Sequence, residues 1–465
     1  MFAILEIEIL RGGRMRFCSL ICYICLCCLS VASNANERLT RAQSMLKQQV
    51  SLMALVQSDE KFDQYKQSLT QHQLSAAELS RIETDITTFW LQRQIPIRSL
   101  ELANQKDPLI RAMAIEPQLD GYLHLQNRIR HLQWLAEQDW WQVIESERLI
   151  RPGESNPIIP DVVRRLWLLG DASSAATGSN ELNLPIVDAL KRFQLRHGLK
   201  ADAIIGPETL KWLNVPPEQR ASILAKNFIQ RAEFMAQRDD RFLVINIPAF
   251  EMELFDHGEL ELASRVIVGK PYRPTPILSS SISNVVINPS WRVPKKIMYN
   301  DLLPQVRKDG NYISQRNFDV FDRNNNLVMR TAEQWSDLAK GPFPFRFVQR
   351  PGTNNTLGRY KFYFPNDFSV YLHDTSDPKL FQRSNRALSS GCIRIENVQG
   401  LANWMAANLV KDKQTWVDRH ADRKRTQWFA LKSSLNVHLV YWTAWIDGSN
   451  QAQYRDDIYQ LQEGS

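Results

Sequence analysis

The sequence predicts an α+β, multidomain protein in which N-terminal helical domains precede a β-rich domain with an inserted cap. A chain of 465 residues has room for about three domains. Between Tyr122 and Leu132, apolar residues recur at the three- and four-residue spacing of an amphipathic helix. Further on, short runs of aromatic and branched residues predict strands over 242–247, 252–255 and 262–268. The two patterns occupy different parts of the chain, which favours separate domains.

Residues 1–35 are typical of a secretory signal peptide. Arg14 and Arg16 precede an apolar run over 17–32, and Ser33-Asn34-Ala35 supplies small residues for cleavage. We therefore expect the mature chain in the periplasm. The alternative is an uncleaved signal-anchor, which would hold the chain at the inner membrane, although the run is short for a membrane span.

Two helical domains are expected after the leader. Residues 36–150 are rich in Gln, Leu and Arg with helical spacing and predict a scaffold domain. Arg151-Pro152-Gly153 marks a boundary, and a second helical domain is predicted over 151–217. Pro216-Pro217 ends it, and a linking helix is expected over 218–239.

The β-rich domain is predicted over 240–465. Asp256-His257-Gly258, between two of its strands, suits a hairpin turn. A polar insertion at about 297–348 shows little strand alternation. Long insertions between strands tend to be lids or binding loops, so we expect a cap there.

Charge and motifs exclude several classes of function. The formal net charge of +7 at pH 7 is mild for 465 residues and favours at most a weak attraction to an anionic polymer. No block of Lys and Arg of the nucleic-acid kind stands out, so no nucleic-acid partner is expected. The sequence has no Walker loop, no Gly-x-Gly-x-x-Gly after a strand and no His/Cys/Asp cluster at metal spacing. We expect neither a metal nor another cofactor.

Cys392 is the one cysteine outside the leader. The other five are Cys18, Cys22, Cys25, Cys27 and Cys28. In an oxidising compartment, Cys392 therefore has no partner for an internal disulfide. It is either a buried bystander that packs as a small apolar residue or a thiol kept for its reactivity.

The neighbours of Cys392 favour reactivity. Gly391 suits a tight turn, because glycine adopts backbone angles closed to other residues. On such a turn, the backbone N–H groups of Ser390, Gly391 and Cys392 can form an oxyanion hole. Arg394 adds a positive charge that favours the thiolate or binds an anionic substrate group.

His373 is the candidate base. It follows a run of aromatic and branched residues, 368–372, that predicts a strand, so it should stand at a strand end that faces a cleft. Any one of the eight histidines is more often structural than catalytic, but the strand end and the later cysteine favour His373 as proton donor and acceptor. The residues alone predict an exported cysteine acyltransferase or hydrolase.

His373 followed by Ser389-Ser390-Gly391-Cys392-Ile393-Arg394 resembles the active-site signature of the YkuD-type L,D-transpeptidases. That family usually has Ser-His-Gly-Cys, and a serine in place of the second residue is typical of the large YcbB-like branch. Further similar motifs follow the family's order at 268–276, 288–294, 349–358 and 441–445. The resemblance implies a β-rich catalytic domain and no cofactor.

The resemblance also implies a reaction on peptidoglycan stem peptides. Cys392 would attack the third residue of a tetrapeptide donor, a diaminopimelate, release D-alanine and form a 3→3 cross-link to an acceptor amine. Two alternatives stay open: a carboxypeptidase- or amidase-like hydrolase on the same fold, and a non-catalytic wall-binding scaffold. Cell-wall synthesis proteins are candidate partners.

The segments 189–199 and 205–209 resemble the small helical peptidoglycan-binding domain. Ala203 stands where that family prefers glycine, which bears on the conformation of the loop. The sequence leaves open whether this domain binds glycan or supports its neighbour.

Trp291 and Tyr371 are predicted, with Arg394, to bind substrate. Both aromatic residues flank strand ends that carry family motifs, and an aromatic wall suits an extended peptide. Packing in the core is the alternative for both. In the YcbB-like branch, the insertion that corresponds to 297–348 is a mobile cap over the active site.

Overall fold

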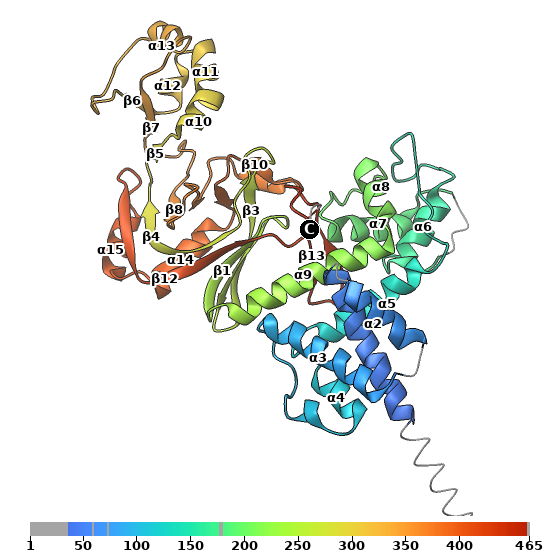
Figure 1. The fold of residues 1–465 in the computed structure, drawn as a ribbon. Coiled ribbons are helices and arrows are strands. Elements are labelled where there is room, and N and C mark those ends of the chain that lie inside the picture. The colour runs from blue at the N-terminus through green and yellow to red at the C-terminus, as the bar shows by residue number, and fades with distance from the viewer. Residues whose placement is uncertain (1–35, 58–59, 72–73, 176–179, 463–465) are drawn as a thin grey trace, which may run out of the picture. The chain divides into compact units, whose positions relative to one another are not determined.

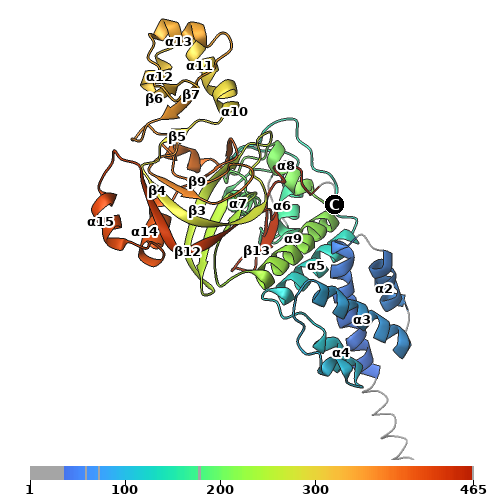
Figure 2. The same ribbon diagram turned by 60° about the vertical axis from the view of Figure 1, so that its left-hand side comes forward.

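The computed structural model describes residues 36–57, 60–71, 74–175 and 180–462. The predicted signal peptide or signal-anchor, 1–35, lies outside these residues. Within the described ranges, no helix combines the length and the apolar character needed to cross a bilayer. Figures 1 and 2 label the helices and strands.

Contacts divide the chain into two compact units. One holds the described residues up to Trp141 together with Val215–Gln237 and Gly448–Asn450. The other holds Gln142–Asn214, Arg238–Asp447 and the described residues from Gln451 onward. The predicted domain boundaries stay predictions, but the second helical segment shares a unit with the β-rich segment instead of standing alone.

The first unit is helical. Its elements are a helix over 36–56, α2 (Glu60–Gln71), α3 (Ala76–Gln92), the 3₁₀ turn η1 (Leu102–Asn104), α4 (Pro108–Ala114), α5 (Tyr122–Ala136) and α9 (Pro217–Gln237). Ser75 and Glu78 form a capping box that satisfies free N–H groups at the start of α3. The predicted apolar face is confirmed, because Leu125, Ile129 and Leu132 are buried in α5, which packs against α9.

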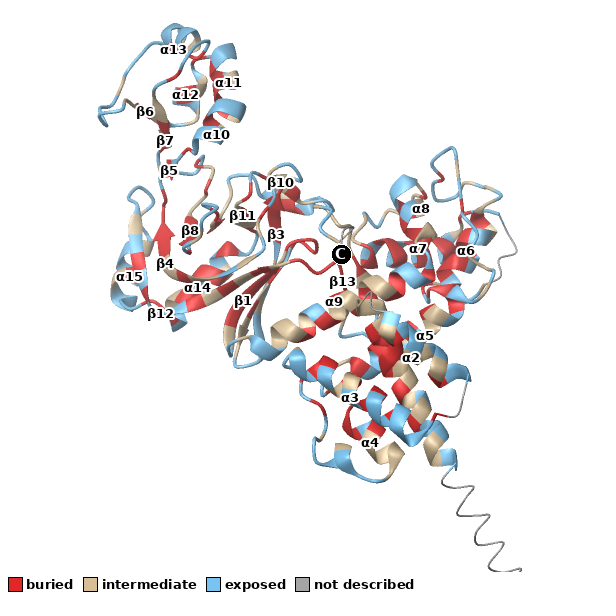
Figure 3. Ribbon diagram, in the orientation of Figure 1, coloured by how far each residue is buried: buried red, intermediate tan, exposed pale blue. Residues whose placement is uncertain are grey.

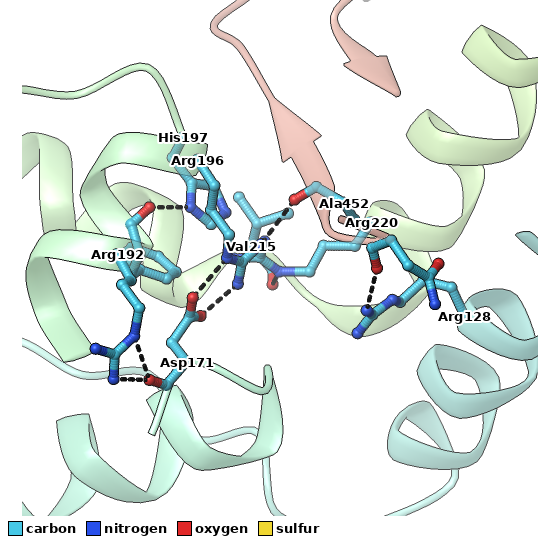
Figure 4. Close-up of polar contacts among 10 residues, drawn as sticks. Arg128, Asp171, Arg192, Arg196, His197, Val215, Arg220 and Ala452 are labelled. Carbon is cyan, nitrogen blue, oxygen red and sulfur yellow. Dashed lines mark hydrogen bonds and ion pairs between the residues drawn. The ribbon is translucent and has the colours of Figure 1, made fainter. Parts of the chain in front are cut away.

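Three helices open the second unit: α6 (Ile159–Leu168), α7 (Leu184–Arg196) and α8 (Pro207–Asn214). Arg196 on α7 binds Asp171 in a two-pronged ion pair, with Nε to Oδ1 at 2.7 Å and Nη2 to Oδ2 at 2.5 Å. Its remaining Nη1 donates to the carbonyl of Ala452 at 3.1 Å (Figure 4). This buried pair ties β14 (Ala452–Tyr454) to helices that lie far away in the sequence.

Ala203 adopts a φ of 56°, in the left-handed region that favours glycine. For a residue with a Cβ atom, this conformation costs about 1–2 kcal/mol. The buried Gln194 side chain stabilises it by accepting from the Ala203 N–H at 2.8 Å and donating to the Ile204 carbonyl at 3.0 Å. The loop thus keeps the geometry that glycine would favour.

Nine strands form one sheet in the order β10-β3-β11-β9-β8-β4-β12-β1-β2. Their bounds are β1 (Arg241–Asn246), β2 (Glu251–Asp256), β3 (Glu259–Gly269), β4 (Leu278–Ile287), β8 (Tyr360–Tyr363), β9 (Leu372–His373), β10 (Ala387–Ser389), β11 (Ile393–Ile395) and β12 (Gln427–Val440). Because β2 pairs with β3 as well as with β1, the sheet closes on itself.

The main apolar core lies inside this closed sheet and extends to the helices that follow β11. Buried residues of α14 (Val398–Asn408) and α15 (Lys413–His420) belong to the same cluster as the strands. A short 3₁₀ helix, η3 (Pro378–Gln382), connects β9 to β10, and β13 (Ala444–Ile446) pairs with β14. The helices and strands confirm the predicted α+β fold class.

The hairpin predicted at Asp256-His257-Gly258 is confirmed. β2 ends at Asp256 and β3 begins at Glu259, so His257 and Gly258 alone form the turn. Both have positive φ, 51° and 86°, as a two-residue hairpin turn of the favoured hand requires.

The strand predicted over 368–372 is wrong for most of its length. Only Leu372 and His373 are in β9, whereas Ser369 has a φ of 58°. The cause is Asn366, whose side-chain oxygen accepts from the N–H groups of Phe368 and Val370 at 3.1 and 3.0 Å. An asparagine that bonds nearby backbone offers it an alternative to the sheet ladder.

The cap insertion, 297–348, is more regular than predicted. It contains β6 (Phe318–Phe321) and most of β7 (Arg346–Gln349). Together with β5 (Trp291–Arg292) they form a three-stranded sheet in which β7 lies between β5 and β6. The helical elements are α10 (Lys295–Ile297), the π-helix η2 (Met298–Leu302), α11 (Leu303–Lys308), α12 (Tyr312–Gln315) and α13 (Ala332–Leu338). The sequence missed the strands because four residues are too few to show alternation.

The cap has an apolar core of its own. Buried side chains of α11, β6, β7 and α13 meet there, with Phe318, Phe343 and Phe347 in contact through their rings. The red patches among the cap elements in Figure 3 mark these buried residues. The cap is therefore stabilised by its own apolar core, which is separate from the core inside the large sheet.

We expect Asp171→Ala to lower the free energy of unfolding by about 3–5 kcal/mol, because it leaves the buried Arg196 guanidinium without its counter-charge. Asp337→Ala is the matched control, since the Lys340–Asp337 pair has side chains 66% and 74% exposed. Its loss should cost at most about 1 kcal/mol. Urea unfolding of the full chain measures both, and equal losses would contradict the structural role of the buried pair.

Candidate active site

A cavity of about 1090 Å³ lies beside the ends of β9 and β10. The structure brings all the predicted site residues to its lining: Trp291, Tyr371, His373, Ser390, Gly391, Cys392 and Arg394. Cap residues, among them Ile297, Asn300 and Asp301, line it as well. The grouping is observed, whereas the role of each residue stays a prediction.

Hydrogen bonds fix the turn that carries Cys392. Gly391 has a φ of 115°, which requires glycine, because a side chain would strain the backbone there. The buried Ser389 hydroxyl donates to the Cys392 carbonyl at 2.5 Å and accepts from the Gly391 N–H at 3.0 Å. Thr275 Oγ1 donates to the Gly391 carbonyl at 2.8 Å. The turn is therefore held on both sides before any substrate binds.

One predicted oxyanion donor needs a correction. The Gly391 N–H points at Ser389 Oγ, so it is already engaged. The sequence could not show this, because the bond depends on the rotamer of Ser389. The other two predicted donors, the backbone N–H groups of Ser390 and Cys392, stay predictions.

The Cys392 thiol is enclosed by its neighbours although part of the residue is exposed at the cavity. Burial raises the pKa of the thiol, while the Tyr371 backbone N–H and the charges of Lys361 and Arg394 act in the opposite direction. Sγ lies 3.9 Å from the carbonyl of Ser369. At neutral pH the resting cysteine is therefore a thiol.

His373 is buried and uncharged. Burial lowers the pKa of His373 to about 3, and the positive charge of Arg394 adds to the effect. Its Nδ1 lies 2.5 Å from the carbonyl oxygen of Asp374. A carbonyl can only accept, so Nδ1 carries the proton and Nε2 keeps a free lone pair. This tautomer can take a proton through Nε2.

Comparison with known proteins assigns the two parts of the second unit. Residues 240–418 match the YkuD family, the L,D-transpeptidase catalytic domain, and residues 160–213 match the family described as "Putative peptidoglycan binding domain". The chain carries an L,D-transpeptidase catalytic domain. The resemblance to the YkuD-type catalytic domain and to the peptidoglycan-binding domain is thereby confirmed.

A curated relative agrees with this assignment. The "Putative L,D-transpeptidase" of Haemophilus influenzae is 38% identical over 221 residues, which are 47% of this chain and 44% of the relative. The chain thus spans under half the length of the relative that it matches.

Solved structures similar to the chain include two mycobacterial proteins. An L,D-transpeptidase from Mycobacterium smegmatis is 12% identical, over 43% of this chain and 58% of that one, with a TM-score of 0.21. L,D-transpeptidase 1 of Mycobacterium tuberculosis is 14% identical, over 43% of this chain and 62% of that one, with a TM-score of 0.20. These scores are low, so the assignment depends on the sequence matches.

Two aromatic residues connect the transpeptidase domain to its cap. The Tyr371 hydroxyl faces both Cys392 and Trp291. Burial holds the pKa of Tyr371 well above its usual value, and the neighbouring Cys392 acts in the same direction. Trp291 is only 7% exposed and packs in the cap core, with its ring 6.3 Å from that of Phe318. Trp291 lines the cavity and also packs in a core, so its role in substrate binding stays a prediction.

Arg273 is a site residue that sequence reasoning missed. Its Nη1 donates to Asp301 Oδ2 at 2.6 Å and to Ser390 Oγ at 2.9 Å, and its Nη2 donates to Asp301 Oδ1 at 3.2 Å. Asp301 belongs to the π-helix of the cap, and Ser390 to the turn of the transpeptidase domain that carries Cys392. Arg273 lies in a matched motif, but no spacing in the sequence indicates Asp301.

We expect acid to destabilise the folded chain through His373. The unfolded histidine binds a proton below about pH 6.5, whereas the folded one does so only near pH 3. Unfolding therefore takes up a proton in this window, and stability falls by up to about 1.4 kcal/mol per pH unit as pH decreases.

Urea unfolding of wild type and His373→Asn between pH 7 and pH 4.5 measures this effect. Asparagine keeps an amide donor but cannot titrate, so the stability of the variant should fall less steeply with acid. His257→Asn, at a histidine whose side chain is 76% exposed in a turn, should follow wild type. Parallel pH profiles of wild type and His373→Asn would contradict the buried neutral imidazole.

Proposed function

We propose that this chain is an L,D-transpeptidase that forms 3→3 peptidoglycan cross-links through a cysteine acyl-enzyme. The observation that carries the proposal is the presence of a held thiol, Cys392, and a neutral imidazole, His373, in one cavity of a domain matched to this family. Peptidoglycan stem peptides would be the substrates, and the periplasm the site of the reaction. A non-catalytic scaffold would not require a thiol and an imidazole in one cavity, so the Cys392–His373 pair argues against that alternative.

Acylation would begin with an uncharged pair. His373 Nε2 accepts the thiol proton while Sγ attacks the carbonyl of the third residue of the donor stem. The N–H groups of Ser390 and Cys392 stabilise the negative charge that develops on the carbonyl oxygen. As the C–N bond breaks, the imidazolium returns the proton to the amine of the departing D-alanine. A thioester on Cys392 remains.

Cross-linking would reverse these roles. The amine of an acceptor stem attacks the thioester carbonyl, His373 takes the proton that the amine loses, and the thiolate leaves and recovers that proton. The product is an amide bond between two third residues. No step needs a group from outside the chain and its two substrates.

Arg394 is suited to bind a carboxylate of the stem peptide. It lines the cavity, and its Nε is buried without a hydrogen-bond partner in the described part of the chain. A buried donor without a partner costs free energy that an incoming carboxylate would recover. The stem peptides that we propose as substrates carry such carboxylates.

The peptidoglycan-binding-like residues would support the reaction by holding glycan near the transpeptidase domain. That role, and contact with other cell-wall synthesis proteins, are proposals drawn from the matched domain types.

We expect Cys392→Ala to abolish cross-linking and leave the fold intact, because one thiol is lost at a turn whose hydrogen bonds use backbone and other side chains. Purified wild type and variant are incubated with disaccharide tetrapeptides, and products are identified by mass spectrometry. A carbapenem should add covalently to wild type alone. Trimmed stems without cross-links would show a hydrolase, and a variant that still cross-links would place the nucleophile elsewhere.

We expect the cap to favour the amine acceptor over water, because a cap over the cavity would exclude water from the thioester. Replacing residues 297–348 with a short Gly/Ser linker should raise the ratio of hydrolysed to cross-linked product. Asp301→Asn tests the same effect with the cap intact, because it weakens the bond from the cap to Arg273. Asp337→Asn, at an exposed cap position, is its control. An unchanged ratio in both the deletion and Asp301→Asn would rule this role out.

A further inference from the structure

Three strands place two cations on either side of His373. Lys361 on β8 is the direct partner of His373 on β9, and Arg394 on β11 is its direct partner on the other side. Residues directly opposite each other in a sheet project from the same face. The register therefore builds a row, Lys361–His373–Arg394, beside the Cys392 turn.

Lys361 is a half-buried cation that has no carboxylate partner in the described part of the chain. Its ammonium lies 3.8 Å from the centre of the Tyr371 ring, on which it is held by a cation–π contact. Among the described residues, no Asp or Glu oxygen lies within ion-pair distance of it, whereas the lysines Lys61 and Lys211 both have such partners. A partly desolvated ammonium without a counter-charge is costly, so an anion that forms nearby would offset that cost.

The other charged groups around the row are already engaged. The Asp374 carboxylate accepts from the N–H groups of Arg359 and Thr375 at 2.7 Å each. Asp377 acts on Arg394, and the Arg273–Asp301 pair lies at the cavity wall. The remaining group that can become anionic next to the Tyr371 ring is the thiol of Cys392. Burial lowers the pKa of Lys361, and a negative charge on Cys392 would oppose this effect.

We propose that Lys361 is a positioning residue that stabilises the thiolate of Cys392 from behind Tyr371 and disfavours a charged His373 at rest. This inference rests on the proposed function, because it assigns Cys392 as the nucleophile. The thiolate forms when the S–H proton moves to Nε2 of His373, and the Lys361 ammonium offsets the negative charge on sulfur. The imidazolium, which has a cation on each side, then gives its proton readily to the leaving amine.

The test is the pH dependence of Cys392 alkylation by iodoacetamide. Peptide mass spectrometry of the full chain follows Cys392 separately from the leader cysteines in wild type, Lys361→Met, Lys361→Arg and Lys432→Met. Lys432 is an exposed lysine of the same sheet and controls for net charge. Lys361→Met should shift the alkylation profile to higher pH and slow alkylation at pH 7 by about tenfold, with rates converging at high pH.

Lys361→Arg should restore the wild-type profile, and Lys432→Met should not change it. If Lys361→Met melts below the assay temperature, Lys361→Gln, which keeps a polar head group, takes its place. A folded Met or Gln variant whose profile superimposes on that of wild type overturns the proposal.

The readout needs no peptidoglycan, so the two proposals fail separately. If the wild-type protein makes no cross-links but Lys361→Met still shifts the alkylation profile, the proposed function is wrong and the role of Lys361 stands. If the wild-type protein makes cross-links but Lys361→Met leaves the alkylation profile unchanged, the role of Lys361 is wrong and the proposed function stands.

Discussion

The parallel pairing of β9 with β11 is the constraint on which the site depends. It sets Ile393 opposite Leu372 and Arg394 opposite His373. Because Cys392 directly precedes β11 and Tyr371 directly precedes β9, the same register brings the thiol beside Tyr371. A shift by one residue would send every side chain of the short β11 to the opposite face, and Arg394 would no longer flank His373. Two short strands, fixed by longer neighbours, therefore decide the geometry of the chemistry.

The electrostatics of the cavity follow from this geometry. The two residues that would exchange a proton are both uncharged at rest, because burial disfavours a thiolate and an imidazolium alike. Positive charge is instead held on residues beside them, Lys361 and Arg394. This arrangement differs from a thiolate–imidazolium pair formed in advance, since it stores no anion in the free protein. Negative charge is stabilised when it develops, and the thiol is protonated until then.

The sequence was most informative about reactive residues, because a lone cysteine or a histidine at a predicted strand end can be recognised without the fold. A lone cysteine beside a glycine, and a histidine before a polar loop, led to Cys392 and His373 without knowledge of the fold. Helix faces such as the one over 122–132 were also predictable, because periodicity is local.

Features that depend on pairing or on one rotamer were not predictable. Nothing in the sequence distinguishes Lys361 from other lysines. Its proposed role follows from its pairing with His373 across the sheet. The Asn366 side chain accepts from the Val370 N–H and so replaces the predicted strand with a turn. The Ser389 hydroxyl likewise accepts from a nearby backbone N–H, that of Gly391. The cap strands were too short for an alternating pattern to show in the sequence. Their strand conformation depends on the pairing of β6 with β7.

The contact between Arg196 and the Ala452 carbonyl has a consequence for the order of folding. The second unit joins residues near 196 to residues near 452, and its sheet inserts β12, over 427–440, between β1 and β4. A chain that emerges from its N-terminus therefore cannot close this sheet until almost all of it is available. Such long-range closure is slow, because distant segments must meet before their contacts can stabilise the structure. During synthesis, the sheet that carries His373 and Cys392 therefore stays incomplete until β12 has been made.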